Sequence, residues 1–111
     1  MSDLRKDTRY ESFAKVKIKS IGKKEFALKD LSVTGCRMEC PAEIDIMPSM
    51  VFTLQIKPEN DSKISSFNLE AESKWIRISG SSCQIGFFII QAPKGKQFQR
   101  YVDYLSWRHS H

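Results

Sequence analysis

Five residues in the first third of the chain are of types that suit the binding of an anionic, planar ligand. They are Arg5, Arg9, Asp30, Ser32 and Gly35. A guanidinium group presents a planar fork of donors that fits phosphate and the O6/N7 edge of guanine, and its face stacks on a base. A carboxylate accepts hydrogen bonds and matches the N1–H and N2–H₂ donors of guanine, while a serine hydroxyl bonds a phosphate or a base edge. Glycine lets the backbone approach a ligand closely. Together these groups describe a site for a guanine nucleotide.

The same residues also have a purely structural interpretation. The stretch 30-DLSVTGC-36 lies between two short apolar runs, and Asp, Ser, Thr and Gly are the residues that turns prefer. Arg5 and Arg9 would then belong to a basic N-terminal arm. On residue types alone, a binding rim and an ordinary turn both remain open.

The distribution of charge favours an anionic partner such as a nucleotide, a nucleic acid or a phospholipid surface. The net charge is +5, and residues 1–40 carry ten basic and six acidic side chains against eight and seven in residues 41–111. Lysines that alternate with apolar residues, at Lys15, Lys17 and Lys19, are explained as the solvent face or protected edge of a strand. Arg5 and Arg9 precede that strand and need another explanation.

Period-2 alternation and short apolar runs predict strands over residues 13–21, 25–31, 36–40, 50–57, 67–75 and 83–90. The clearest alternation runs from Phe67 to Trp75 and places both aromatic rings in the core. A change of phase near Ile76 and Ile78 predicts a β-bulge or bend. The run 87-FFII-90 alternates little, which predicts burial on both sides.

The last segment changes to a helical period. Phe98, Tyr101, Val102 and Leu105 fall on one stripe of an amphipathic helix that begins after Pro93 and Gly95. Six short strands and one terminal helix predict an all-β fold with one helix, a six-stranded antiparallel β-barrel. A two-sheet sandwich is the alternative.

Two motifs in this order resemble the signature of the PilZ domain family. They are 5-RKDTR-9, which reads Arg-x-x-x-Arg, and 30-DLSVTG-35, which reads Asp-x-Ser-x-x-Gly. The stretches 73-SKWIR-77 and 84-QIGFFI-89 resemble later strands of the family, so the resemblance covers nearly the whole chain. It implies a PilZ-like split barrel with a C-terminal α-helix that binds cyclic di-GMP, the bacterial second messenger.

The resemblance also implies an organisation and a site. Residues 1–111 would form a single PilZ-like domain, with a flexible N-terminal arm at 1–12, the barrel at 13–92 and the helix at 93–109. Arg5 and Arg9 would clamp phosphates and guanine faces, and Asp30, Ser32 and Gly35 would line the rim of the barrel. The further candidates are Lys6, Leu4 and Thr34. Lys6 stands where family members often have a second arginine, and it keeps the charge but loses the planar fork.

Several other classes of protein are disfavoured. His109 and His111 lie at the end of the chain and no other histidine is available as a general base, which argues against an enzyme. Cys36, Cys40 and Cys83 match no zinc spacing and are expected to pack in the core as free thiols, with neither metal nor cofactor. No apolar run is long enough for a membrane helix, and the polar N-terminus lacks a signal peptide, which favours the cytoplasm.

The function implied is therefore a cytoplasmic bacterial receptor that binds cyclic di-GMP and, through ordering of the N-terminal arm, signals to an unidentified effector protein in motility, envelope or polysaccharide machinery. No DNA or RNA partner and no membrane insertion are expected. The alternatives are a small basic barrel that binds single-stranded nucleic acid and a protein-interaction module without a ligand. The first alternative requires aromatic side chains exposed on a strand face, whereas Phe26, Phe52, Phe67 and Trp75 are all predicted to be in the core.

Overall fold

The strands form where apolar residues alternate with polar ones, and they are separated by polar or proline-containing turns. A computed structural model describes residues 8–91 and 95–111. Its elements are β1 (Tyr10–Glu11), β2 (Lys15–Ile18), β3 (Glu25–Leu31), β4 (Gly35–Pro41), β5 (Val51–Lys57), β6 (Phe67–Ser79), β7 (Ser82–Gln91) and α1 (Gln97–Ser110), with one 3-10 turn, η1, at Asn60–Ser62.

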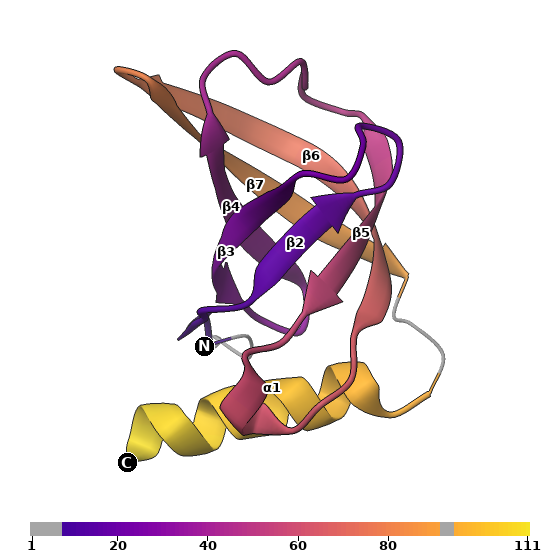
Figure 1. Ribbon diagram of the computed structural model, residues 1–111, viewed down its shortest axis with the longest axis vertical. Coiled ribbons are helices and arrows are strands. Elements are labelled where there is room, and N and C mark those ends of the chain that lie inside the picture. Colours follow the sequence, from indigo (N-terminus) through magenta and orange to yellow (C-terminus); the bar gives the residue numbers. More distant parts are fainter. Residues whose placement is uncertain (1–7, 92–94) are drawn as a thin grey trace, which may run out of the picture.

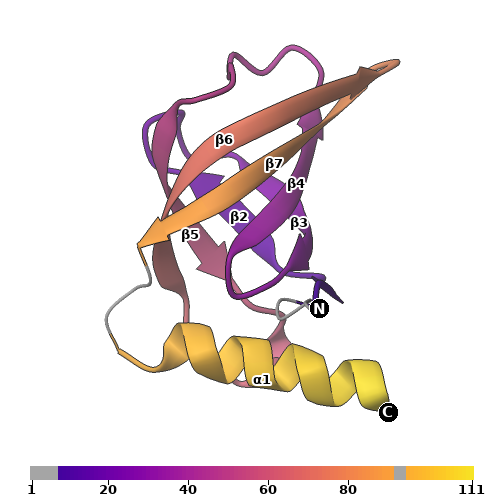
Figure 2. The same cartoon turned by 180° about the vertical axis from the view of Figure 1, so that it is seen from behind.

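Six of these strands close into an antiparallel barrel (Figures 1 and 2). The neighbours are β3, β2, β5, β6, β7 and β4 in that order, and the pairing of β3 with β4 completes the circle. This confirms the predicted barrel with a C-terminal helix and excludes the open sandwich. The two-residue β1 lies outside the circle, where Tyr10 pairs with Leu31 and Glu11 with Asp30. β1 therefore places Arg9, which directly precedes it, beside Asp30 near the end of β3.

The interior of the barrel is filled by the inward side of each alternating strand. Val16 and Ile18 of β2, and Leu54 and Ile56 of β5, are fully buried, as the alternation predicts. The three cysteines are buried free thiols, so the prediction of core packing is confirmed for them. Among the described residues, no group of three His, Cys, Asp or Glu side chains is placed to hold a metal ion.

Trp75 is the main correction to the predicted core, because its side chain lies on the outer face and is 38% exposed. The cause is an irregularity in β6: Ser73 pairs with Phe87 but Trp75 pairs with Gly86, which leaves Lys74 as an extra residue. A single extra residue reverses which side chains point inward. The bulge at Lys74 thus lies two positions before Ile76 and four before Ile78, the residues near which the sequence predicts the phase change.

Two other expectations about strands are also wrong in detail. The run 87-FFII-90 does alternate, since Phe87 and Ile89 are buried whereas Phe88 and Ile90 are about half exposed. Phe13, which the sequence places at the start of a strand, precedes β2 and is 62% exposed. Both errors come from aromatic or aliphatic side chains that the barrel leaves on its surface.

Helix α1 lies across the end of the barrel at which β1 and the β3–β4 turn are found (Figures 1 and 2). Its buried side chains are the four of the predicted stripe: Phe98, Tyr101, Val102 and Leu105. The ring of Phe67 at the start of β6 meets the rings of Phe98 and Tyr101 at centroid distances of 5.9 and 6.0 Å. The apolar stripe therefore closes this end of the core.

A polar cluster around Glu59, in the loop after β5, ties the helix to the barrel. The Glu59 carboxylate accepts hydrogen bonds from Tyr101 and Arg108 of the helix and, at 3.4 Å, from the backbone N–H of Phe13. Ser12 lies 2.7 Å from the Tyr101 hydroxyl. Burial raises the pKa of Tyr101 above its usual range, and its hydrogen bond to Glu59 raises that pKa further. Tyr101 therefore stays protonated and acts as a donor to Glu59.

Candidate functional site

The turn between β3 and β4 is held together by the Ser32 side chain. The backbone N–H groups of Thr34 and Gly35 both donate to Ser32 Oγ, at 3.2 and 3.1 Å, and the Ser32 N–H donates to the Gly35 carbonyl at 2.8 Å. Ser32 is almost completely buried. The hydroxyl that the sequence assigns to ligand contact is therefore engaged in shaping the turn.

Gly35 occupies a position where no side chain fits. A Cβ there would lie 2.6 Å from the Phe87 carbonyl oxygen of β7 and 3.5 Å from Nη2 of Arg9. The first of these distances is a backbone clash. Gly35 thus lets β4 approach β7 and leaves room for the Arg9 guanidinium over the turn.

Asp30 lies between two arginines at this rim. Arg9 Nη1 is 2.9 Å from Asp30 Oδ1, and Arg37 Nε is 2.9 Å from Asp30 Oδ2. Arg37 also donates from Nη1 to Gln84 Oε1 at 3.0 Å. The Asp30 side chain is only 14% exposed, whereas that of Arg9 is 49% exposed. Two guanidinium groups around one carboxylate leave a net positive charge facing solvent.

The register of four strands extends this rim into a row across the outer surface. Asp30 of β3 pairs with Arg37 of β4, Arg37 with Gly86 of β7, and Gly86 with Trp75 of β6. A Cβ at Gly86 would lie 2.2 Å from atoms of the Trp75 indole, so the ring covers the glycine. The guanidinium of Arg77 lies 5.2 Å from the indole centroid. We call Asp30, Arg37, Gly86 and Trp75 the binding row.

The binding row and Arg9 combine three kinds of group that suit a nucleotide. The guanidinium groups supply donors for phosphate oxygens or a guanine edge. The carboxylate of Asp30 is an acceptor for amide-like N–H donors. An exposed indole offers a stacking surface, and base–aromatic stacking contributes about 1–3 kcal/mol per base.

The residues predicted from the sequence are brought together as far as the structure describes them. Arg9, Asp30, Ser32 and Gly35 lie at one rim, and Thr34 lies in the same turn, with Oγ1 3.4 Å from Ser32 Oγ. Leu4, Arg5 and Lys6 lie outside the described residues. β1 is the element that joins the two motifs, because its pairing with β3 sets Arg9 beside Asp30.

Sequence reasoning missed three residues of the site: Arg37, Trp75 and Gly86. The alternation of Arg37 with Cys36 and Met38 was a usable signal, since a charged residue between two core residues must point outward. Trp75 gave the opposite signal, because its side is set by the bulge at Lys74. Gly86 gave none, since its role depends on a neighbour in another strand.

Cys36 lies directly beneath the rim but belongs to the core. Burial raises its pKa to about 12; the negative charge of Asp30 adds to the rise and the positive charge of Arg9 opposes it. The thiol is therefore neutral at physiological pH and is not a nucleophile.

Comparison with known proteins supports the fold through structures alone. No family model and no curated protein matches the chain. The structure is similar to that of the Bacillus subtilis inhibitor of motility MotI/DgrA, with a TM-score of 0.83, 14% identity and coverage of 98% of this chain. The chain spans 53% of that protein's length.

A second similar structure is the PilZ domain of YcgR from Escherichia coli, solved with cyclic di-GMP. The TM-score is 0.71 and the identity 17%, over 96% of this chain and 95% of that one. The resemblance to PilZ domains seen in the two sequence motifs is thus confirmed at the level of the fold: this chain has the barrel and terminal helix of a PilZ domain.

Proposed function

We propose that this PilZ-fold chain binds cyclic di-GMP at Arg9 and the binding row, and that it acts as a receptor rather than as an enzyme. The observation that carries the proposal is the 2.9 Å contact between Arg9 and Asp30, because it places the two halves of the sequence signature at one rim. The YcgR domain of the same fold, solved with this ligand, supports the choice.

Binding would proceed by exchange of ion pairs. Arg9 is half exposed, and an exposed ion pair contributes only about 0–1 kcal/mol. A charge-assisted hydrogen bond to a phosphate contributes about 1.5–3 kcal/mol. The Arg9 guanidinium therefore leaves Asp30 for a phosphate at little cost, and the freed carboxylate oxygen becomes an acceptor for guanine. Arg37 keeps the second oxygen of Asp30 in place.

The receptor would signal to another protein. The likeness to an inhibitor of motility favours a motility effector among the candidates, with envelope and polysaccharide machinery as the others. A cytoplasmic location follows from this role. In the part of the chain that the structure describes, the helix is neither long nor apolar enough to cross a membrane.

A specific observation also supports a second candidate, binding of single-stranded nucleic acid. Trp75 and Phe88 are exposed on the outer faces of adjacent strands, and Lys74 Nζ lies 5.6 Å from the centre of the Phe88 ring. Exposed aromatic rings with cations between them are what such proteins use. The argument from a buried Trp75 against this candidate is therefore wrong, and the experiment must separate the two ligands.

Calorimetric titration of the chain with cyclic di-GMP, and with GTP and a short single-stranded oligonucleotide as controls, tests the proposal. We expect saturable binding of the cyclic dinucleotide alone. Arg9→Ala and Arg5→Ala should abolish measurable binding at micromolar ligand, and Asp30→Ala should weaken it strongly. The matched control is Arg100→Ala, an exposed arginine on α1.

Two results would overturn the proposal. Wild-type affinity in Arg9→Ala would remove Arg9 from the site. Binding of the oligonucleotide without binding of cyclic di-GMP would establish the second candidate instead.

A further inference from the structure

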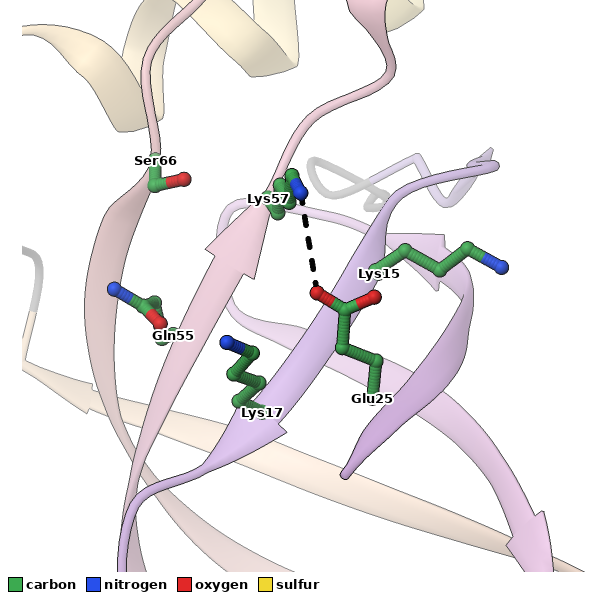
Figure 3. A pocket seen from close by; sticks show the side chains of 6 residues that line it. All are labelled: Lys15, Lys17, Glu25, Gln55, Lys57 and Ser66. Carbon is green, nitrogen blue, oxygen red and sulfur yellow. Dashed lines mark ion pairs between the residues drawn. The ribbon is translucent and has the colours of Figure 1, made fainter. Parts of the chain in front are cut away.

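The two barrel strands that the binding row does not use, β2 and β5, carry three lysines on one outward face (Figure 3). Lys15 and Lys17 point outward because Val16 and Ile18, which alternate with them, are fully buried. Lys57 of β5 pairs directly with Lys15, and Gln55 pairs with Lys17. The three lysines therefore emerge on one face of the barrel, with the Lys15 side chain extending away from the other two (Figure 3).

This gathering is not explained by protection of a sheet edge. Lysines guard edges that are open to another strand, but β2 is paired on both sides, with β3 and with β5. Like charges directly opposite each other destabilise a strand pair. One carboxylate, that of Glu25, lies among the lysines, and its Oε2 is 4.0 Å from Lys57 Nζ. One negative charge leaves the surface positive.

The surface is hollowed into a groove. A hollow of about 240 Å³ is lined by the three lysines, Glu25, Gln55 and Ser66. A second hollow of about 250 Å³ shares Lys15, Glu25 and Lys57 with the first and continues to Phe13, Pro58, Glu59 and Asn60. We call these two hollows together the lysine groove. It has a positive centre. At one end lie the Glu59 carboxylate, which is paired with Arg108, and the partly exposed ring of Phe13, whose centroid is 4.9 Å from the Arg108 guanidinium.

We propose that the lysine groove is a docking surface for an acidic segment of a partner protein, one in which carboxylates lie beside an apolar side chain. The ammonium groups match carboxylates by charge, and no arginine lines either hollow to offer the guanidinium fork that selects phosphate. Arg108, beside Phe13, is already bonded to Glu59. Two adjoining hollows that share three lining residues suit an extended segment better than a small anion. Phe13 provides the apolar contact.

The proposal does not rest on ligand binding at the binding row, because the two surfaces share no residue. Loss of one therefore leaves the other measurable. The proposal specifies which residues the partner presents, acidic ones beside an apolar one, and the fold alone does not specify them.

Fluorescence anisotropy with a labelled peptide of alternating glutamate and phenylalanine is the test, on the full chain. Replacing all three lysines, as K15E/K17E/K57E, should weaken binding by about tenfold or more, since like charges then face each other across the interface. The matched control, K19E/K23E/K24E, makes the same change in net charge with exposed lysines outside the groove. It should weaken binding by less than about threefold, through the overall field alone.

Amide shifts of the wild-type chain on addition of the peptide provide a readout that needs no variant. They should fall on β2, β5 and Phe13 and spare the turn from Ser32 to Gly35. Phe13→Ser should reduce the affinity for the glutamate–phenylalanine peptide by more than it reduces the affinity for a peptide of glutamate alone. Cyclic di-GMP affinity of K15E/K17E/K57E should stay within about threefold of wild type, the loss that the overall field alone produces, which separates a failure of this proposal from a failure of the proposed function.

Three results would overturn the proposal. Equal losses of peptide affinity in the two triple variants would show that net charge alone controls binding and that the groove is not a specific site. Shifts away from β2 and β5 would place the peptide elsewhere. Binding of vesicles of anionic phospholipid, or of inorganic phosphate, without binding of the peptide would replace the protein partner by a phosphate-bearing one.

Discussion

Asp30 and Glu59 are carboxylates of nearly equal exposure, 14% and 12% of the side chain, and each is bonded to an arginine, yet their surroundings differ. Glu59 is held by Tyr101, which is fully buried, and by Arg108, which is 27% exposed, both on the packed helix. Asp30 is held from one side by Arg9, which is half exposed and follows residues outside the described part of the chain.

This difference in partners suggests different roles for two clusters that contain the same kinds of group. A partner that is itself packed cannot leave without opening the core, so the Glu59 cluster stabilises the fold. A partner that is exposed can be exchanged for a ligand group at little cost. The exposure of the arginine, and not that of the carboxylate, is what distinguishes the two.

The largest expected effect comes from breaking the first cluster. Glu59→Ala leaves the Tyr101 hydroxyl with fewer partners and Arg108 without its carboxylate, so we expect a loss of about 2–4 kcal/mol in the free energy of unfolding. Urea denaturation followed by circular dichroism measures it.

The matched substitution in the second cluster is Asp30→Ala. It should change the free energy of unfolding by less than about 1 kcal/mol, because one of its two partners is an exposed arginine. Cyclic di-GMP binding should nevertheless fall. Equal losses of stability in the two variants would contradict the distinction between the clusters.

A smaller effect is expected from Gly86→Ala, which sharpens the comparison on the functional side. The added Cβ collides with the Trp75 indole, which is exposed and can turn away from the barrel. Stability should therefore fall by less than about 1 kcal/mol, while ligand affinity falls several-fold. In a Trp107→Phe background, the emission of Trp75 should move to longer wavelength, and an unchanged spectrum would show that the ring has not moved.

The last effect is absent at neutral pH and appears only in alkaline solution, where it tests whether Cys36 belongs to the core. Its pKa rises from 9.0 to about 12 on folding. Above pH 9 the unfolded chain loses this proton while the folded chain keeps it, so stability falls as pH rises from about 9 toward 12. Cys36→Ala should show a shallower fall between pH 8.5 and about 10.5 in the same denaturation measurement. Parallel curves for the two proteins would contradict the assignment.

Local patterns in the sequence were sufficient for the six strands of the barrel, the helix and most of the core, but not for the two-residue β1. Val16, Leu54 and Leu69 alternate with polar residues and are buried, because period-2 alternation is a direct consequence of strand geometry. Trp75 was assigned to the wrong face since its orientation depends on which residue of β6 has no partner in β7. That information lies in the pairing and not in either strand alone.

The site was only partly predictable for the same reason. Asp30 and Gly35 are recognisable by motif, but Arg37 and Gly86 join the site through their register with each other. Ser32 was assigned correctly to the turn region, while the use of its hydroxyl inside the turn follows from backbone geometry that the sequence does not display.

The register between β4 and β7 has a consequence for the kinetics of folding. Arg37 and Gly86 are far apart in sequence, and pairings of this kind form slowly because a long loop must be closed first. The binding row is complete only when this seam of the barrel has formed, so a chain in which β4 and β7 are unpaired does not present it. A ligand that binds there would bind only folded molecules and, by mass action, would shift the folding equilibrium toward the closed barrel.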